Sequence, residues 1–222
     1  MIEKISPRQF HEAAGTEDWR VLGDGACAYF PTGSFTEGAR LVQAISQLPG
    51  LEAGQPDVDL RHDGVTVRLI TYTEDYMVMS RRDVELARQI SAAARDLGLS
   101  ADTSRLQSLL IIPGATDITK VMPFWRAILG YEPRRDSPNE DLVDPRNRGT
   151  PFWFEKMDEP RADGGGAIHV AIWLPYERAK ERIATALAAG GHMVRDNFAP
   201  MWWTLADAAG NEADISTTMG RE

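Results

Sequence analysis

Aromatic side chains gather on strand-like stretches in the second half of the chain. Alternation along a strand places His169 and Trp173 on one face of the stretch 167–174, and Trp153 and Glu155 on one face of another. Aromatic walls with few polar groups bind flat, apolar small molecules. An imidazole exchanges protons near neutral pH, and a carboxylate can orient it. These residues predict a ligand-binding cup in which a Glu155–His169 pair could act as acid and base.

A packed core is the alternative explanation for at least half of the aromatic residues in this part. Alternation assigns one of Trp202 and Trp203 to the cup, and we take Trp203 as the binding residue. The run Gly164-Gly165-Gly166 is interpreted as a flexible joint, because no Gly-Lys-Ser/Thr follows it as in a phosphate-binding loop.

The composition is that of a soluble globular protein and excludes several partner classes. Of the 222 residues, 43% are hydrophobic and 26% are charged, and the net charge is −9. This charge argues against a nucleic-acid partner and an anionic membrane surface. The single cysteine, Cys27, allows no internal disulfide. With no apolar leader at the start and no run of about 20 apolar residues, we expect a cytoplasmic protein.

The chain divides best at the stretch Gly98–Ser104, which has the composition of a helix end and a linker. We therefore expect domains at 1–98 and 105–222, joined by a linker at 99–104. The first has the order helix, hairpin, helix, hairpin, helix. Its helices begin at Ser6-Pro7, Ser34 and Ser80, three caps of ordinary type.

The second part contains a weak internal duplication. A strand at 106–112 is followed by a helix at 118–129 that Asp117 can cap, and then by short strands. The same order restarts with a strand at 167–174 and a helix at 176–189. Two strand–helix–strands units predict paired βαβββ modules, and the fold class of the whole chain is α+β.

The first part resembles pterin-4a-carbinolamine dehydratases over about residues 4–98. The resemblance rests on Thr71-Tyr72 and on the stretch Ser80–Ala87, which opens the last helix. It implies a small α+β fold with an antiparallel sheet and helices on one face, and a tendency to self-associate. We expect a homodimer, which would also bury exposed sheet edges.

The catalytic signature of that family is incomplete in this sequence. The family has His-His-Pro, then an aromatic residue, then Thr-His; the matching positions are Gly54-Gln55-Pro56, His62 and Tyr72. Gly and Gln cannot exchange protons at pH 7, and a tyrosine is mostly a donor there. We therefore expect that dehydration has been lost, although Gln55 and Tyr72 could still contact a planar ligand. Residual 4a-hydroxytetrahydrobiopterin dehydratase activity that uses Tyr72 and His62 is the weakest alternative.

The second part resembles the vicinal oxygen chelate superfamily, which includes glyoxalase I, extradiol dioxygenases and bleomycin-resistance proteins. The resemblance covers about residues 104–220. It is carried by four short motifs in the right order: Pro123-Phe124-Trp125 with Leu129-Gly130-Tyr131, Ala188–Gly191, Trp203–Asp207, and Gly210-Asn211-Glu212. It implies two βαβββ modules that form a cupped sheet.

Metal-using members of that superfamily carry one ligand at each of four strand positions. The resemblance maps these positions onto Ser108, Glu155, His169 and Asp214. One imidazole and two carboxylates could hold a divalent metal, but a neutral serine hydroxyl is a poor ligand. We therefore expect no cofactor, and treat metal binding by Glu155, His169 and Asp214 as an alternative.

These observations favour a small-molecule binding or sequestering protein that acts through the cup of the second part. The alternative from a different class is a lyase of glyoxalase type or a related metal-assisted enzyme. For both, the expected partner is a small molecule.

Overall fold

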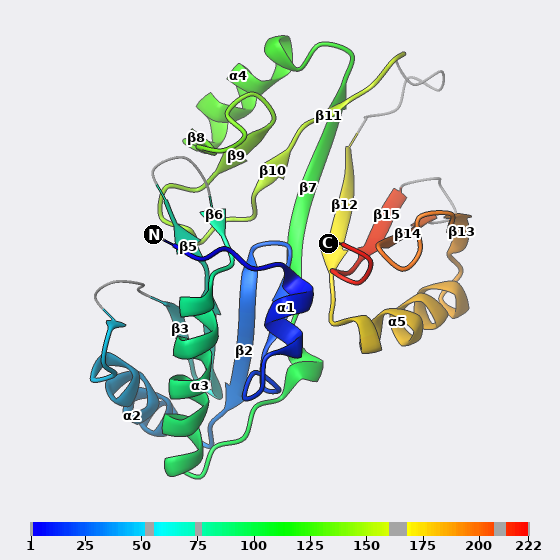
Figure 1. The fold of residues 1–222 in the computed structure, drawn as a ribbon. Coiled ribbons are helices and arrows are strands. Elements are labelled where there is room, and N and C mark those ends of the chain that lie inside the picture. Colours follow the sequence, from blue (N-terminus) through cyan, green and yellow to red (C-terminus); the bar gives the residue numbers. More distant parts are fainter. Residues whose placement is uncertain (1, 52–55, 74–76, 160–167, 207–211, 222) are drawn as a thin grey trace. The chain divides into compact units, whose positions relative to one another are not determined.

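The computed structural model describes residues 2–51, 56–73, 77–159, 168–206 and 212–221 (Figure 1). It divides into two compact units. The first comprises Met1–Gln107 with Leu174–Arg178 and Thr217–Glu222, and the second comprises Ser108–Trp173 and Ala179–Ser216. Several predicted features lie outside the described residues: Gly54, Gln55, Gly164-Gly165-Gly166, Asp207, Gly210 and Asn211.

The first unit is built on a four-stranded antiparallel sheet with the order β1-β2-β4-β3. A separate hairpin of β5 and β6 precedes the last helix. The elements are α1 (Pro7–Glu12), β1 (Arg20–Leu22), β2 (Gly25–Pro31), α2 (Phe35–Ser46), β3 (Asp57–Arg61), β4 (Gly64–Leu69), β5 (Thr71–Tyr72), β6 (Met77–Val78), α3 (Arg81–Asp96) and a 3-10 turn at Thr103–Arg105.

The helices of this unit begin where the serine caps predict. The Ser6 hydroxyl accepts a hydrogen bond from the Gln9 N–H, and the Ser34 hydroxyl accepts one from the Glu37 N–H. Both caps satisfy backbone donors that the first helical turn leaves unpaired. The core lies between the sheet and α2 and α3, and its largest fully buried side chain is that of Trp19. The Trp19 indole N–H donates to the Ser91 hydroxyl on α3 at 3.0 Å.

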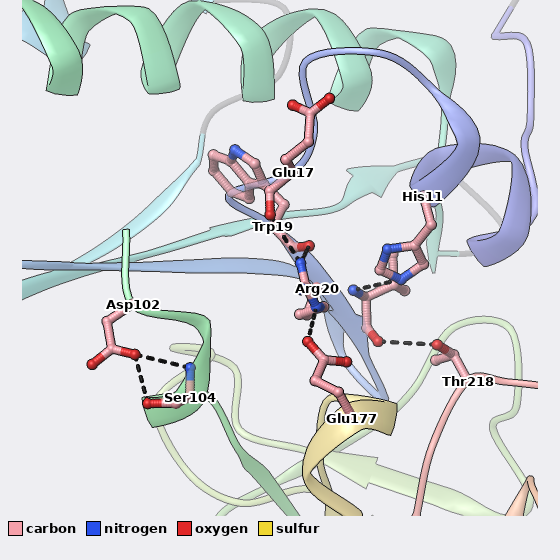
Figure 2. Close-up of polar contacts among 9 residues, drawn as sticks. His11, Glu17, Trp19, Arg20, Asp102, Ser104, Glu177 and Thr218 are labelled. Carbon is pink, nitrogen blue, oxygen red and sulfur yellow. Dashed lines mark hydrogen bonds and ion pairs between the residues drawn. The ribbon is translucent and has the colours of Figure 1, made fainter. Parts of the chain in front are cut away.

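Residues 99–106 belong to this unit. Leu99 and Ala101 pack against its core, and the Asp102 N–H donates to the Tyr29 carbonyl. The Asp102 carboxylate also caps the short turn at Thr103–Arg105 (Figure 2). This segment therefore lies beside β2 through the turn.

A buried polar cluster joins the β5–β6 hairpin to the start of α3. The Asp83 carboxylate accepts hydrogen bonds from the Ser80 N–H (2.6 Å), the Ser80 hydroxyl and the Thr71 hydroxyl (both 2.9 Å). Burial raises the pKa of Asp83, against the lowering effect of these donors. Each buried group in this cluster has a partner, because an unpaired buried donor is costly.

Replacing Asp83 by alanine should lower the free energy of unfolding by about 2 kcal/mol, since the helix loses its cap and two buried hydroxyls lose their acceptor. Urea denaturation measures this change. Glu85→Ala, on an exposed turn of the same helix, is the control and should change stability by less than about 0.5 kcal/mol. Equal effects of the two substitutions would show that the cluster does not hold the hairpin.

The second unit contains two βαβββ modules in one nine-stranded sheet. The strand order is β13-β14-β15-β12-β7-β10-β9-β8, with β11 paired to β7. The first strands of the two modules, β7 and β12, lie antiparallel at the centre (Figure 1). The elements are β7 (Ser108–Ala115), α4 (Ile118–Leu129), β8 (Glu132–Pro133), β9 (Asp141–Val143), β10 (Phe152–Trp153), β11 (Glu155–Lys156), β12 (Ile168–Trp173), α5 (Tyr176–Ala188), β13 (His192–Arg195), β14 (Trp202–Ala206) and β15 (Glu212–Ser216).

Helix α4 covers one face of the first module. Met122 of α4 packs with Leu142 and Phe152 in a core that also includes Ile111 of β7. Asp117 caps this helix and Gly130 ends it in a left-handed conformation, as predicted. The α+β class with paired βαβββ modules is confirmed. In the described part of the chain, no helix has both the length and the apolar character needed to cross a bilayer.

Candidate functional site

The strand register determines which side chains share a face of the second unit's sheet. His169 lies opposite Ile112, and Trp173 lies opposite Ser108. Ile111, the neighbour of Ile112, packs under α4, so the face that carries His169 is the one turned away from α4. We call it the His169 face.

Aromatic residues on three strands point to the His169 face. Trp153 follows Phe152, which packs with the α4 core, so alternation turns Trp153 to the opposite side. Trp173 and Trp202 both lie beside Ser216, one on each side, in a single row across the sheet. Trp173 and Trp202 are therefore about 10 Å apart across two strand spacings. Trp202 stacks on Phe198, with ring centroids 4.2 Å apart.

The assignment of Trp203 to the cup is wrong. Trp203 lies opposite Ile215, which places it on the other face of the sheet, while Trp202 shares the His169 face. Alternation within one strand shows that Trp202 and Trp203 point to opposite faces of the sheet. It does not show which of the two points to the His169 face. The register between β14 and β15 is what decides it.

His169 is held by a carboxylate on a neighbouring strand. Its Nε2 atom lies 3.4 Å from Oδ2 of Asp214. The other carboxylate oxygen of Asp214 accepts a hydrogen bond of 2.6 Å from the hydroxyl of Thr204, which is 1% exposed. Thr204, Asp214 and His169 thus form a chain across three strands, with the imidazole at its end. Thr204 was missed by the sequence analysis, because only the β14–β15 pairing reveals its contact.

The surroundings of His169 favour its protonated form. Burial lowers the pKa of the imidazole, but the hydrogen bond and charge of Asp214 act in the opposite direction. The charges of Glu155 and Glu212 add to the effect of Asp214, and the net result is a raised pKa. The protonated imidazole is therefore more populated at a given pH than in a histidine with the ordinary pKa.

The predicted metal ligands are only partly brought together. His169 and Asp214 are adjacent, whereas Glu155 is exposed on β11 and Ser108 lies at the far end of β7. Both oxygens of Asp214 are engaged, and His169 turns Nε2 to the carboxylate. Among the described residues, no group of three or more His, Cys, Asp or Glu side chains could hold a metal ion. The donor set therefore does not fit a resident metal.

The dehydratase-like positions of the first unit do not form a catalytic group within the described residues. Tyr72 is on β5 and 45% exposed, and His62 is exposed in the turn between β3 and β4. Pro56 directly precedes β3. Gln55, the remaining candidate, lies outside the described residues, so ligand binding by Gln55 stays a prediction.

A histidine for which the sequence shows no partner has a defined role in the first unit. His11 of α1 accepts a hydrogen bond at Nε2 from the Val21 N–H of β1 (Figure 2). The Val21 carbonyl accepts one from the Thr218 hydroxyl, and Arg20 pairs with Glu177 at 2.6 Å. Burial lowers the pKa of His11, and the charge of Arg20 adds to this effect. Neutral His11 is the form that can accept from Val21.

Two family models match separate segments of the chain. Residues 3–93 match the model for pterin 4 alpha carbinolamine dehydratase, and residues 110–216 match the model for a glyoxalase-like domain. Both resemblances seen in the sequence are thereby confirmed. The second match runs from β7 to the end of β15. No curated protein matches the chain.

Two solved structures are similar to about half of the chain. One is NAD-dependent benzaldehyde dehydrogenase from Legionella pneumophila, with 14% identity, a TM-score of 0.35, and coverage of 49% of this chain and 97% of that one. The other is a glyoxalase/bleomycin resistance protein/dioxygenase superfamily member from Vibrio splendidus 12B01, with 15% identity, a TM-score of 0.33, and coverage of 50% and 99%. Similarity at this level does not identify a ligand or a reaction.

The raised pKa of His169 should depend on Asp214. In Asp214→Asn the carboxylate charge is lost while burial remains, so the pKa of His169 should fall below that in the unmodified protein. NMR titration of the imidazole protons measures it, with Asp96→Asn on α3 as the control. A pKa that stays unchanged in Asp214→Asn would contradict the assigned pairing.

The same shift predicts how His169 affects stability. Because its folded-state pKa is raised, its contribution is complete below the ordinary value of 6.5 and is lost as pH rises through the folded-state pKa. Urea denaturation of the unmodified protein and of His169→Gln between pH 5.5 and 8.5 tests this sign. The difference in unfolding free energy between them should shrink as pH rises; a growing difference would contradict it.

His11 should affect the pH dependence of the free energy of unfolding in the opposite direction. Its folded-state pKa is lowered, so its contribution is present above 6.5 and is lost as pH falls toward the folded-state pKa. His11→Gln keeps an acceptor for the Val21 N–H but does not titrate. It should therefore remove part of the stability loss seen between pH 7.5 and 5.5 in urea denaturation. An identical loss in both proteins would exclude His11 as the source.

Proposed function

We propose that the chain binds a flat aromatic small molecule on the His169 face of its second unit. The observation that carries this proposal is that Trp153, Trp173 and Trp202 share one face of the sheet with an imidazole fixed by Asp214. Tryptophan rings supply large, rigid contact areas, and each favourable ring pair contributes about 0.5–1.5 kcal/mol beyond the area it buries. One or two such contacts, with one polar group to orient the ligand, suit a binding protein.

The first unit, in this proposal, no longer dehydrates pterins. Its Gly54 and Gln55 stand where the family has histidines, and neither side chain can exchange protons near neutral pH. His62 is exposed in the turn between β3 and β4, and within the described part of the chain no hydrogen bond holds its ring. Carbinolamine breakdown should therefore be no faster with the protein than in buffer. Acceleration that is lost in Tyr72→Phe would instead support the dehydratase alternative.

A second candidate function is acid–base catalysis by His169, as in a lyase of glyoxalase type. The Thr204–Asp214–His169 chain favours it, because an imidazole held and charged by a carboxylate is an effective proton donor. In such a reaction the His169 imidazole would give a proton to the substrate or take one from it. His169→Ala would abolish such turnover with the fold retained, whereas His169→Ala in a pure binding protein would leave the ligand bound, with weaker orientation.

Tryptophan fluorescence tests the binding proposal. We expect saturable quenching by at least one member of a set of flat probes: quinoline, N-methylquinolinium and quinoline-3-carboxylate. Trp173→Phe and Trp202→Phe should each weaken binding by about three- to tenfold, because a ring contact of about 0.5–1.5 kcal/mol is reduced.

Trp203→Phe is the matched control, because Trp203 is the sequence neighbour of Trp202 but lies on the opposite face. It should leave the affinity unchanged. No saturable quenching by any of the three probes would overturn the proposed function, as would a loss of affinity in Trp203→Phe equal to that in Trp202→Phe.

A further inference from the structure

The charged groups around His169 are unbalanced. Asp214 contacts the imidazole, and Glu155, opposite Gly114 of β7, lies on the same face as Ile112 and His169. Glu212 lies two residues before Asp214 on β15 and therefore points to the same face. One guanidinium, that of Arg195, lies 3.6 Å from Glu212. In the described part of the chain no cation forms an ion pair with Glu155.

Among the described residues around the imidazole, negative charges therefore exceed positive ones in either state of His169. Three carboxylates outnumber Arg195 together with a protonated His169, and the excess grows when His169 is neutral. Each carboxylate is at least partly accessible to solvent. Water and salt therefore weaken, but do not abolish, its interaction with a charged ligand on this face.

A second, separate group of charges lies beside Trp153. Asp141 is opposite Trp153 in the β9–β10 pairing and is 6% exposed. The Arg134 guanidinium serves two carboxylates there: it pairs with Asp136 at 2.5 Å and lies 3.8 Å from Asp141. Beside Trp153, in the first module, the two carboxylates of Asp136 and Asp141 thus share one cation, Arg134.

Tryptophan faces themselves favour positive charge. The ring carries negative potential on its face, so a cation within about 6 Å of the centroid is attracted to it. A neutral flat ligand would gain only stacking on the ring or rings that it contacts, whereas an anion would meet repulsion from the surrounding carboxylates. A flat cation gains from both the rings and the carboxylates.

We infer that the His169 face selects a planar heteroaromatic cation over its neutral and anionic analogues. This inference rests on the proposed function, since it names the class of ligand that the same face takes. The tryptophans provide the flat surface, Glu155 and Glu212 provide the charge preference, and the His169–Asp214 pair supplies an oriented hydrogen-bonding group.

Isothermal titration calorimetry of the full chain at pH 7.5 separates the three ligand charges. The probes are N-methylquinolinium as the cation, quinoline as the neutral analogue and quinoline-3-carboxylate as the anion. N-methylquinolinium should bind at least about tenfold more tightly than the carboxylate and more tightly than quinoline. Its affinity should also fall with added salt, because the attraction is screened.

Charge-neutralising variants locate the source of the preference. Glu155→Gln and Glu212→Gln should each weaken N-methylquinolinium binding by about two- to fivefold and leave quinoline binding unchanged, as expected for partly exposed charges. Glu181→Gln on α5 removes the same charge from outside the sheet and should change neither affinity. Thermal unfolding of each variant confirms that it is folded.

The outcomes distinguish the two proposals. If no probe binds, the proposed function fails and the inference fails with it. If quinoline or the carboxylate binds as tightly as N-methylquinolinium, the face binds flat molecules but the cation preference is wrong. If Glu181→Gln weakens the cation as much as Glu155→Gln and Glu212→Gln do, only overall charge matters, and the assignment to these two carboxylates is overturned.

Discussion

The antiparallel pairing of β7 with β12 is the constraint on which the candidate site depends. Six consecutive residue pairs, from Ile168 opposite Pro113 to Trp173 opposite Ser108, join the two modules into one sheet. A shift of one residue in this register would turn every side chain of β12 to the other face. His169, Trp173 and Trp202, which all lie on strands of the second module, would then point to the side opposite Trp153 of the first module. The pairing between the modules therefore decides whether Trp153 and Glu155 share a face with the His169–Asp214 pair, which the second module forms by itself.

The elements near the site were readable from the sequence because local signals agree with the fold. Asp117 and Gly130 bound α4 as predicted, and the serine caps set the helix starts in the first unit. Such signals depend on residues a few positions apart, and the backbone groups at a helix end must be satisfied locally. Alternation along β12 likewise placed His169 and Trp173 together from the sequence.

The contacts between strands were harder to predict from the sequence. A carboxylate partner for His169 was expected, but Asp214 was placed with it only among the mapped metal ligands. Thr204 was not anticipated, because both contacts depend on the order β14-β15-β12. Strand order and register are decided by residues far apart in the chain, where no local pattern reports them. The error at Trp203 has the same origin. His11 is a further case, since its partner is a backbone N–H that no side-chain pattern can mark.

The contacts of Val21 determine how the sheet of the first unit can grow. Strand β1 is the terminal strand of that sheet, and Val21 directs its N–H and carbonyl away from β2. His11 takes the N–H and Thr218 takes the carbonyl, so an incoming strand finds no groups to pair with at this position (Figure 2). Such saturation protects against β-strand addition and the aggregation that follows from it. Any extension of this sheet by another chain is thereby directed to β3, at the opposite border.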